Sequence, residues 1–234
     1  MSVSAPITVV IPTRDAEDAL PAAATALLPA VIGGIVGRLI VSDAGSRDGT
    51  LRIARALGAE IVTGPAGRGA QIARGVAAAG EGWVLILHAD TILEGDWMAA
   101  VAAHVRGAGP GGEDRAGWFA LRFRAEGAAP RIVAGWANLR ARWAGLPYGD
   151  QGLLVHSSLL ARAGGVPQLP LMEDVALARA LRGRLVRLRG TASTDARRYV
   201  EGGWTRRGAR NLWTLTRYLA GADPARLAKR YERR

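Results

Sequence analysis

The stretch Arg38-Leu-Ile-Val-Ser-Asp-Ala-Gly-Ser-Arg-Asp-Gly-Thr50 joins an apolar run to a polar turn and then to the start of a helical pattern. Its first five residues, 38–42, are typical of a buried strand. Residues 48–57 have the spacing of an amphipathic helix, with Ser46 or Asp48 as its expected N-cap and Gly58 as its expected C-cap. A strand that leads into a helix through a short turn is the repeating unit of α/β proteins.

The same alternation continues on both sides of this unit. Helical patterns cover residues 16–28 and 69–79. Short apolar runs predict further strands at residues 7–11, 59–63 and 83–87. We therefore predict an α/β fold with a central, mostly parallel sheet and helices on both faces.

After Asp90 the pattern becomes less regular. The sequence there predicts a small antiparallel part, with strands at 118–124, 152–155 and 185–188, helices at 96–105, 132–143 and 175–181, and a glycine-rich loop at 106–115. No repeat or linker divides the chain, so a single domain is expected, followed by basic helices over residues 201–234.

Composition excludes several classes of site. The 234 residues include no cysteine and only three histidines, which excludes disulfide frameworks, cysteine-bound metals and thiol nucleophiles. The net charge of +11 is concentrated in residues 179–234, which hold 16 basic and 4 acidic residues. Such a tail suits a polyanionic partner, whether anionic lipid, a nucleoside diphosphate or nucleic acid.

One uncharged stretch, residues 19–37, has nearly the length of a membrane span. It is rich in alanine and is interrupted by proline and glycine, so we interpret it as a helix that stops near Pro29, a turn and a buried strand. The N-terminus lacks the basic and apolar regions of a signal peptide. These features predict a cytoplasmic protein, with a peripheral position at the inner face of the membrane as the alternative.

The turns after the strands exclude two common nucleotide-binding motifs. The first strand ends in Ile11-Pro-Thr-Arg-Asp15, where a dinucleotide-binding fold would carry Gly-x-Gly-x-x-Gly. The pair of glycines in Gly67-Arg-Gly69 comes after the third strand, too late for that motif or for a P-loop.

Carboxylates stand where the strands end. Asp43 follows the second strand and Asp90 the fourth. Ligands of open parallel sheets bind at the carboxyl ends of the strands, so these two side chains are expected at one crevice. Clustered carboxylates there suit Mg²⁺ or Mn²⁺ bound together with substrate phosphates. The alternative for each aspartate is a turn or a helix cap.

Four segments together resemble a known family. Val10-Ile-Pro-Thr13, Val41 to Thr50, Leu87-His-Ala-Asp90 and Met172-Glu-Asp174 are similar to family 2 glycosyltransferases, which have the GT-A fold. The resemblance extends from Ile7 to about Tyr231. Further segments resemble a bacterial subgroup, the radical-SAM/selenodomain-associated transferase 2 type, which is sometimes assigned to arsenosugar biosynthesis; they are Gly67 to Gln71, Leu87 to Thr91, Tyr148 to Gly152 and Leu171 to Val175.

The resemblance implies a division of the chain and roles for its residues. Residues 1–92 would bind the nucleotide of a nucleoside-diphosphate sugar, a UDP-sugar above all, and residues 93–200 the acceptor. The nucleotide-sugar side would be formed by Pro12, Thr13, Asp15 and Asp43 at the base and ribose, Arg68 at the base or diphosphate, and Arg197 and Arg198 over the diphosphate.

The resemblance also implies the catalytic residues. Asp90 occupies the last position of an Asp-x-Asp motif and would bind Mg²⁺ or Mn²⁺. His88 replaces the first aspartate, where it would bind the metal or the ribose, or only pack. Asp174 occupies the position of the general base of inverting members, with Glu173 beside it to orient it or raise its pKa. Both carboxylates also suit a helix N-terminus, where they would serve as caps.

Acceptor-side residues are expected in the second half. Asp150 and Gln151 are candidates for hydrogen bonds to sugar hydroxyls. Trp118 and Tyr148, like Trp136 and Trp143, would stack on a sugar or pack in the core.

The basic tail has the pattern of an interfacial helix. Over residues 204–219, Gly208, Leu212, Leu215 and Leu219 form one stripe, and Arg206, Arg207, Arg210 and Arg217 fall opposite. An anionic membrane surface is one partner for such a helix, and docking on its own domain is the alternative. No nucleic-acid motif accompanies the charge, so nucleic acid is not expected.

Three classes of function therefore remain. The first is a metal-assisted inverting glycosyltransferase. The second is a GT-A-like nucleotidyltransferase, which would need a glycine-rich phosphate loop after the first strand. The third is a non-catalytic peripheral membrane scaffold.

Overall fold

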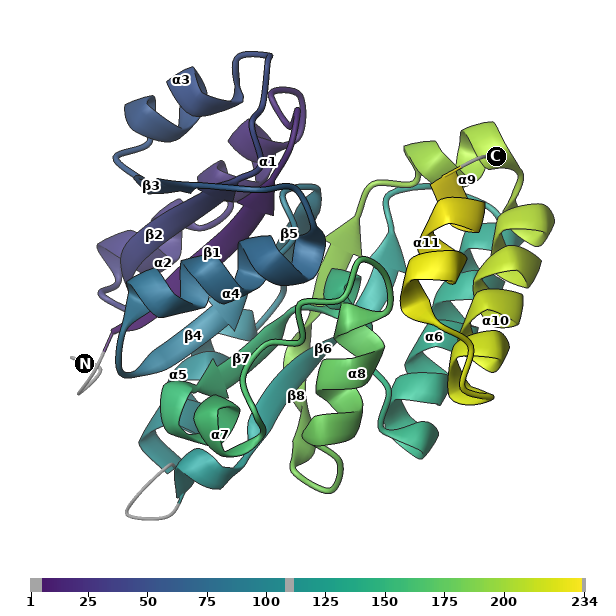
Figure 1. Ribbon diagram of the computed structural model, residues 1–234. Helices are drawn as coiled ribbons and strands as arrows, with labels where there is room; N and C mark the ends of the chain where they lie inside the picture. Colours follow the sequence, from purple (N-terminus) through teal and green to yellow (C-terminus); the bar gives the residue numbers. More distant parts are fainter. Residues whose placement is uncertain (1–5, 108–111, 233–234) are drawn as a thin grey trace.

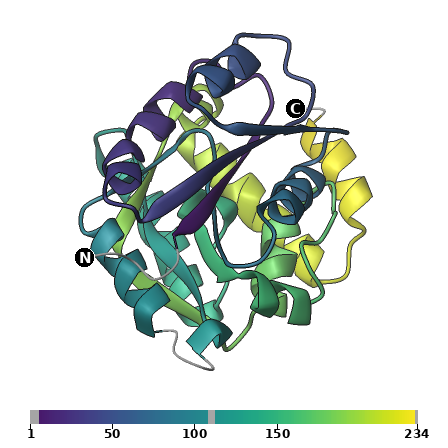
Figure 2. The ribbon, with the colours of Figure 1, turned by 90° about the vertical axis from the view of Figure 1, so that its left-hand side faces the viewer.

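The computed structural model describes residues 6–107 and 112–232. Its eight strands form one mixed sheet in the order β3-β2-β1-β4-β7-β6-β8-β5. Helices cover both faces of this sheet (Figures 1 and 2). The predicted α/β class, with a mixed central sheet and helices on both faces, is confirmed.

The N-terminal half is parallel. Its strands are β1 (Ile7–Thr13), β2 (Val36–Asp43), β3 (Glu60–Thr63) and β4 (Trp83–Ile86). In the register of β1 and β2, Thr13 lies opposite Asp43, so the ends of the two strands are level. The β-branched and leucine side chains of β1 and β4 are almost completely buried, as both faces of a parallel sheet require.

Helices on the two faces of this half bury separate cores. One face packs against α1 (Leu20–Thr25), α2 (Leu28–Ile32), α3 (Thr50–Ala56) and α5 (Trp97–Gly107). The other packs against α4 (Arg68–Ala79), α7 (Ser157–Arg162) and α8 (Glu173–Ala180). A valine of β1, Val10, lies so close to Gly75 of α4 that a side chain at that position would collide with it.

The second half continues the sheet with mixed directions. Its strands are β5 (Thr91–Glu94), β6 (Ala116–Phe123), β7 (Leu153–His156) and β8 (Leu185–Thr194). β7 is antiparallel to β4 and to β6, whereas β8 is parallel to β6 and antiparallel to β5. The antiparallel prediction for 118–124 therefore holds only on the side that faces β7.

The C-terminal helices form one end of the molecule. They are α9 (Arg197–Gly202), α10 (Trp204–Leu219) and α11 (Pro224–Glu232), and α10 packs on α6 (Ala128–Ala144) as well as on its two neighbours. Figure 1 shows them together on the side of the sheet away from β1–β3. None of the described helices is long and apolar enough to cross a membrane.

Several boundaries differ from the predicted ones. The helix expected at 16–28 is shorter, since α1 ends at Thr25, and Pro29 lies in the first turn of a second short helix, α2, instead of ending the first. β8 has ten residues and not four, and neither β5 nor α7 was predicted. Part of the loop predicted at 106–115 is helical: α5 continues to Gly107, and a 3₁₀ turn covers Gly112–Asp114. The rest of that loop, 108–111, lies outside the described residues. A second 3₁₀ turn covers Gly149–Gln151.

Candidate active site

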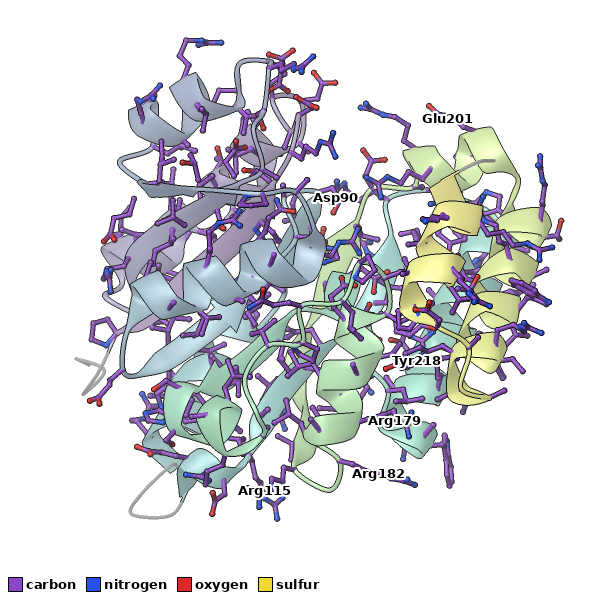
Figure 3. All side chains as sticks on the ribbon, viewed as in Figure 1. Asp90, Arg115, Arg179, Arg182, Glu201 and Tyr218 are labelled. Atoms are coloured by element: carbon purple, nitrogen blue, oxygen red, sulfur yellow. The ribbon has the colours of Figure 1, made fainter. Side chains whose placement is uncertain are left out.

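An open cleft of about 950 Å³ lies where the end of β4 faces the C-terminal helices. Asp90, which lines it, is labelled in Figure 3 to the left of α9. The other lining residues come from several parts of the chain: Arg68, His88, Phe123, Tyr148, Asp150, Leu171, Met172, Glu173, Asp174, Thr194, Asp195, Arg198, Tyr199, Arg207 and Asn211.

The β4–β5 connection supplies His88 and Asp90. The Asp90 carbonyl accepts hydrogen bonds from Arg124 Nη2 at 2.9 Å and from the Asp195 backbone N–H at 3.2 Å, which fixes this connection. Burial, and then the charge of Arg68, lower the pKa of His88 to about 4, so the imidazole is neutral at pH 7. Its Nε2 is buried and has no hydrogen-bond partner among the described residues.

The start of α8 supplies Glu173 and Asp174. Met172 precedes them with φ 66°, a left-handed conformation that non-glycine residues seldom adopt outside functional sites. Asp174 Oδ1 accepts from the N–H of Val175 at 2.8 Å, and Oδ2 accepts from the N–H of Gly149 at 3.1 Å. These two bonds fix the carboxylate at the cleft.

Glu173 is almost completely buried beside Asp174. Burial, and then the Asp174 charge, raise the pKa of Glu173 to about 7. Arg68, at the start of α4, opposes this shift, because its Nε lies 3.6 Å from Glu173 Oε1. Burial lowers the pKa of Arg68, but Glu173, Asp174, Asp90 and Asp150 together raise it above its ordinary value. Arg68 is therefore the central cation among four carboxylates.

The turn around Asp150 closes another side of the cleft. Burial, and then the charges of Asp174 and Asp90, raise the pKa of Asp150 to about 6, although Arg140 opposes them. Oδ1 of Asp150 is buried without a hydrogen-bond partner among the described residues. The Arg140 guanidinium lies 3.3 Å from the ring centroid of Tyr148, whose pKa is raised by burial.

The residues predicted for the base and ribose form a separate group at the ends of β1 and β2. Asp43 is fully buried, and its Oδ1 accepts from Thr13 Oγ1 at 2.9 Å and from Ser46 Oγ at 2.5 Å. Its Oδ2 accepts from the N–H groups of Gly45 and Ser46, both at 2.8 Å. Burial raises the pKa of Asp43, but these hydrogen bonds outweigh it and hold the pKa below its ordinary value.

The neighbouring members of this group are more accessible. Asp15 is exposed in a left-handed conformation, and its Oδ1 accepts from the N–H of Arg47 at 2.8 Å. Pro12 is half-buried on β1. None of Pro12, Thr13, Asp15 and Asp43 lines the 950 Å³ cleft.

Three of the predicted site residues do not line the cleft for other reasons. Gln151 is fully buried: its Nε2 donates to the Phe119 carbonyl at 3.3 Å, and its Oε1 accepts from the Tyr148 N–H at 3.1 Å. This amide holds the turn 149–151, and its predicted acceptor role stays a prediction. Trp118 is 3 % exposed within β6, as expected if it packs in the core, and its acceptor role likewise stays a prediction. Arg197 is exposed and points to Asp18 at 3.4 Å, whereas Arg198 does line the cleft.

The tail prediction missed the residues that α10 brings to the cleft. Its docked face contains buried Thr214 and Leu215, together with half-buried Trp204, Arg207, Asn211 and Tyr218. The prediction placed Arg207 opposite the apolar stripe, but the face that docks on the domain mixes polar and apolar residues. Arg207, Asn211 and Leu215 are spaced four residues apart, which places them on one side of the helix. This spacing is the sequence signal for the docked face.

The metal-binding prediction can be compared with the donor atoms present. The described residues include no group of three or more histidines and carboxylates placed to hold an ion by themselves. Magnesium at nucleotide sites takes one or two protein carboxylates and completes its shell with phosphate oxygens and water. The Asp90 carboxylate and the unpartnered His88 Nε2 suit an ion that arrives with a diphosphate.

Comparison with known proteins matches part of the chain to a family. Residues 8–112 match the model of the family described as Glycosyl transferase family 2. No curated protein matches the chain.

Solved structures resemble most of the fold. A mycobacterial protein has 23% sequence identity and a TM-score of 0.60, with 90% of this chain and 74% of that chain covered. Glucosyl-3-phosphoglycerate synthase from Mycobacterium tuberculosis, solved with Mn²⁺, UDP-glucose and glycerol 3-phosphate, has 22% identity and a TM-score of 0.57, covering 89% of this chain and 79% of that one. The same synthase with Mn²⁺, UDP and glucosyl-3-phosphoglycerate has 21% identity and a TM-score of 0.54, covering 82% and 71%.

The matched segment contains β1 to β4 and the His88–Asp90 connection, and the sheet as a whole has the arrangement of the GT-A neighbours. Residues 8–112 of this chain are similar to family 2 glycosyltransferases, and the chain as a whole has the GT-A fold of its solved neighbours.

Proposed function

We propose that this glycosyltransferase moves a sugar from a nucleoside-diphosphate donor, a UDP-sugar above all, to an acceptor hydroxyl with inversion at the anomeric carbon. One observation carries the proposal. Asp90, Asp174 and Arg198 line a single cleft, although they come from the β4–β5 connection, the start of α8 and α9. A general base and charge-stabilising groups in one cleft are what a displacement of a diphosphate requires.

Asp174 acts as the general base in this proposal. Among the described residues, each of its carboxylate oxygens accepts one backbone hydrogen bond, which orients the group and leaves lone pairs for the acceptor hydroxyl proton. Glu173 is buried and paired with Arg68, so these two residues hold the neighbouring Asp174 in position. The acceptor hydroxyl attacks from the face opposite the leaving diphosphate, and this displacement inverts the centre.

The diphosphate is assigned to the cationic and metal-binding part of the cleft. Asp90 and His88 would hold Mg²⁺ or Mn²⁺, and Arg68 and Arg198 lie on the same cleft. When bound, the ion would stabilise the negative charge that develops on the leaving diphosphate. The solved neighbours support this assignment, because their structures contain Mn²⁺ or Mg²⁺ with UDP.

The nucleoside and the acceptor are assigned to the two sides of this centre. Pro12, Thr13, Asp15 and Asp43 would shape the pocket of the base and ribose at the ends of β1 and β2. Tyr148 and Asp150 would contact the acceptor, because they line the cleft near Asp174. Residues 204–219 would contact an anionic membrane surface, a proposal that the exposed Leu212 and Leu219 support.

Nucleotide binding is tested first. Thermal denaturation is measured with UDP, GDP, CDP, ADP and dTDP, with and without Mn²⁺ or Mg²⁺. A ligand at about 100 times its dissociation constant adds roughly 2.7 kcal/mol to the free energy of unfolding. We expect a metal-dependent shift with UDP, which Asp90→Asn abolishes and Asp174→Asn retains. A folded protein that none of the nucleotides stabilises would favour the scaffold alternative.

Turnover is then measured as release of the nucleoside diphosphate. We expect Asp174→Asn and Asp90→Asn each to lower kcat by about 10² or more. Asp96→Asn, at an exposed aspartate outside the cleft, is the matched control and should leave turnover unchanged. Full activity in both cleft variants would show that the assignment of the base and of the metal residue is wrong.

A further inference from the structure

The solvent face of α6 carries a row of large apolar side chains. Ile132, Trp136, Leu139 and Trp143 are 70%, 51%, 49% and 77% exposed. Their spacing of i, i+4, i+7 and i+11 places them in one stripe along the helix. We call these four residues the α6 stripe. Scattered apolar residues are normal on a protein surface, but a continuous row on one helix marks an interaction site.

The opposite face of α6 explains the packing of the helix without the stripe. Pro130, Ala134, Ala137 and Ala141 are buried against the domain. The usual distribution is therefore reversed: small residues face the core, and tryptophan, isoleucine and leucine face water. The packing of α6 on the domain does not use these four side chains, so their exposure indicates contact with a partner.

Charge identifies the chemistry of that partner. Neither α6 nor α10, which packs on it, contains an aspartate or glutamate. Arg131 and Arg142 are exposed on α6, and Arg206 and Arg217 are exposed on α10. Figure 1 shows the two helices side by side at the same end of the molecule. The surface around the stripe is thus cationic.

We propose that the α6 stripe inserts into the interface of an anionic membrane, with the surrounding arginines on the lipid head groups. Tryptophan suits the boundary between head groups and acyl chains, and arginine beside it suits anionic lipid. A second copy of this chain fits less well, because a two-fold contact through this face would bring its arginines against one another. The inference rests on the peripheral-membrane part of the proposal above and is independent of sugar transfer.

The stripe is linked to the active site through one side chain. Arg140 of α6 donates from Nε to the Leu146 carbonyl at 2.9 Å, and its guanidinium covers the ring of Tyr148 at the cleft. Trp143 stands only five residues before Tyr148 in the chain. A membrane that holds α6 would therefore hold the acceptor side of the cleft close to its surface.

Vesicle flotation of the full chain, without nucleotide, tests the inference. Wild-type protein is mixed with phosphatidylcholine vesicles, with or without phosphatidylglycerol, at low and at high salt. Trp136→Ser and Trp143→Ser remove stripe residues, and Leu212→Ser and Leu219→Ser test α10 separately. Ile32→Ser is the matched control, because Ile32 is 86% exposed on α2, which Figure 1 shows at the far side of the molecule. Circular dichroism and UDP-dependent thermal shifts confirm that each variant folds and binds as wild type does.

We expect wild type to bind vesicles that contain phosphatidylglycerol, more weakly at high salt because salt screens the arginines. The two tryptophan variants should lose about tenfold or more in vesicle affinity, and Ile32→Ser none. The inference is overturned if wild type binds no anionic vesicle, or binds neutral vesicles equally well. It is also overturned if only the α10 variants lose binding, or if sedimentation finds a dimer that Trp136→Ser dissociates. If wild type binds anionic vesicles but transfers no sugar, the proposed reaction is contradicted and this inference still stands.

Discussion

The Asp174 carboxylate and the backbone N–H of Gly149 are joined by a 3.1 Å hydrogen bond that ties the start of α8 to the turn 149–151. On its other side Gly149 touches the imidazole of His88: a β-carbon at this position would lie 2.5 Å from Nε2. The proposed base and the β4–β5 connection are therefore positioned by one glycine between them. Small displacements of this turn move both sides of the site.

Gly149→Ala is expected to displace His88 or the turn, because the added methyl group overlaps the imidazole. Overpacking of this kind costs about 1–3 kcal/mol of stability. The nucleotide-dependent thermal shift and kcat should both fall. Gly135→Ala, on the exposed side of α6 where nothing lies within 4 Å, is the control and should be neutral or stabilising. Equal behaviour of the two variants would contradict the contact.

Glu173→Gln is expected to change how stability depends on pH. Because the pKa of Glu173 is raised from about 4.5 to about 7 on folding, the folded protein binds more protons than the unfolded chain between these values. Stability attributable to Glu173 is therefore present below pH 4.5 and is lost as the pH rises through 7, by up to about 3 kcal/mol. Glu173→Gln should remove this loss.

Urea denaturation of wild type and Glu173→Gln between pH 5 and about 8 measures the difference. Glu81→Gln, at an exposed turn, is the control variant. If the free energy of unfolding changes with pH in the same way for wild type and Glu173→Gln across this range, Glu173 titrates normally.

Asp43→Asn is expected to destabilise the protein and loosen the turn 44–46. The buried carboxylate accepts four hydrogen bonds, and an amide can accept at only one of its two terminal atoms. Loss of hydrogen bonds to a charged group costs about 2–3 kcal/mol. Because the pKa of Asp43 is lowered, this stability is present above its unfolded pKa and is lost as the pH falls through the folded value.

Thermal unfolding at neutral pH checks this prediction, with Ser46→Ala as a graded control that removes one side-chain donor. Ser46→Ala should lose less than Asp43→Asn. If Asp43→Asn unfolds at the wild-type temperature, the hydrogen-bond network does not stabilise the turn.

Arg207→Ala is expected to lower kcat/KM by about tenfold, because the variant lacks a guanidinium that lines the cleft. Loss of one hydrogen bond that involves a charged group has about this effect. Arg207 lines the cleft, its Nη1 donates to the Arg198 carbonyl at 3.4 Å, and its guanidinium lies 5.5 Å from the ring centroid of Tyr199. Arg206→Ala, at the exposed neighbouring position, is the matched control. Steady-state kinetics on both variants compares them, and an equal effect would mean that α10 acts only through its total charge.

The N-terminal half of the fold was predictable because its signals are local. The apolar runs of β1, β2 and β4 are buried on both faces, so each strand is visible as a short continuous run. β8 was predicted at less than half its length because residues after Leu188, such as Arg189 and Gly190, interrupt the apolar pattern. They belong to the strand because β5 pairs with its second half, a contact that no local pattern contains.

The same distinction applies to the site. Asp90, Asp174 and Asp150 were recognised from the motifs around them, and all line the cleft. Gln151 and Trp118 belong to similar polar and aromatic contexts, yet they are buried. Residue type and spacing indicate which side chains have the required chemistry, but exposure depends on what the rest of the chain places over them.

The sequence by itself determined the similarity of residues 8–112 to the family 2 glycosyltransferases, the parallel strands and the carboxylates that follow them. Hydrophobic periodicity and short motifs are properties of neighbouring residues. Only the tertiary structure decided that Arg207 and Asn211 of α10 enter the cleft and that Trp136 and Trp143 remain outside the core. These outcomes depend on how α6 and α10 dock on the sheet, and docking is the sum of contacts between residues far apart in the chain. A helix pattern predicts which residues share a face, whereas the surface that meets it determines which face is buried.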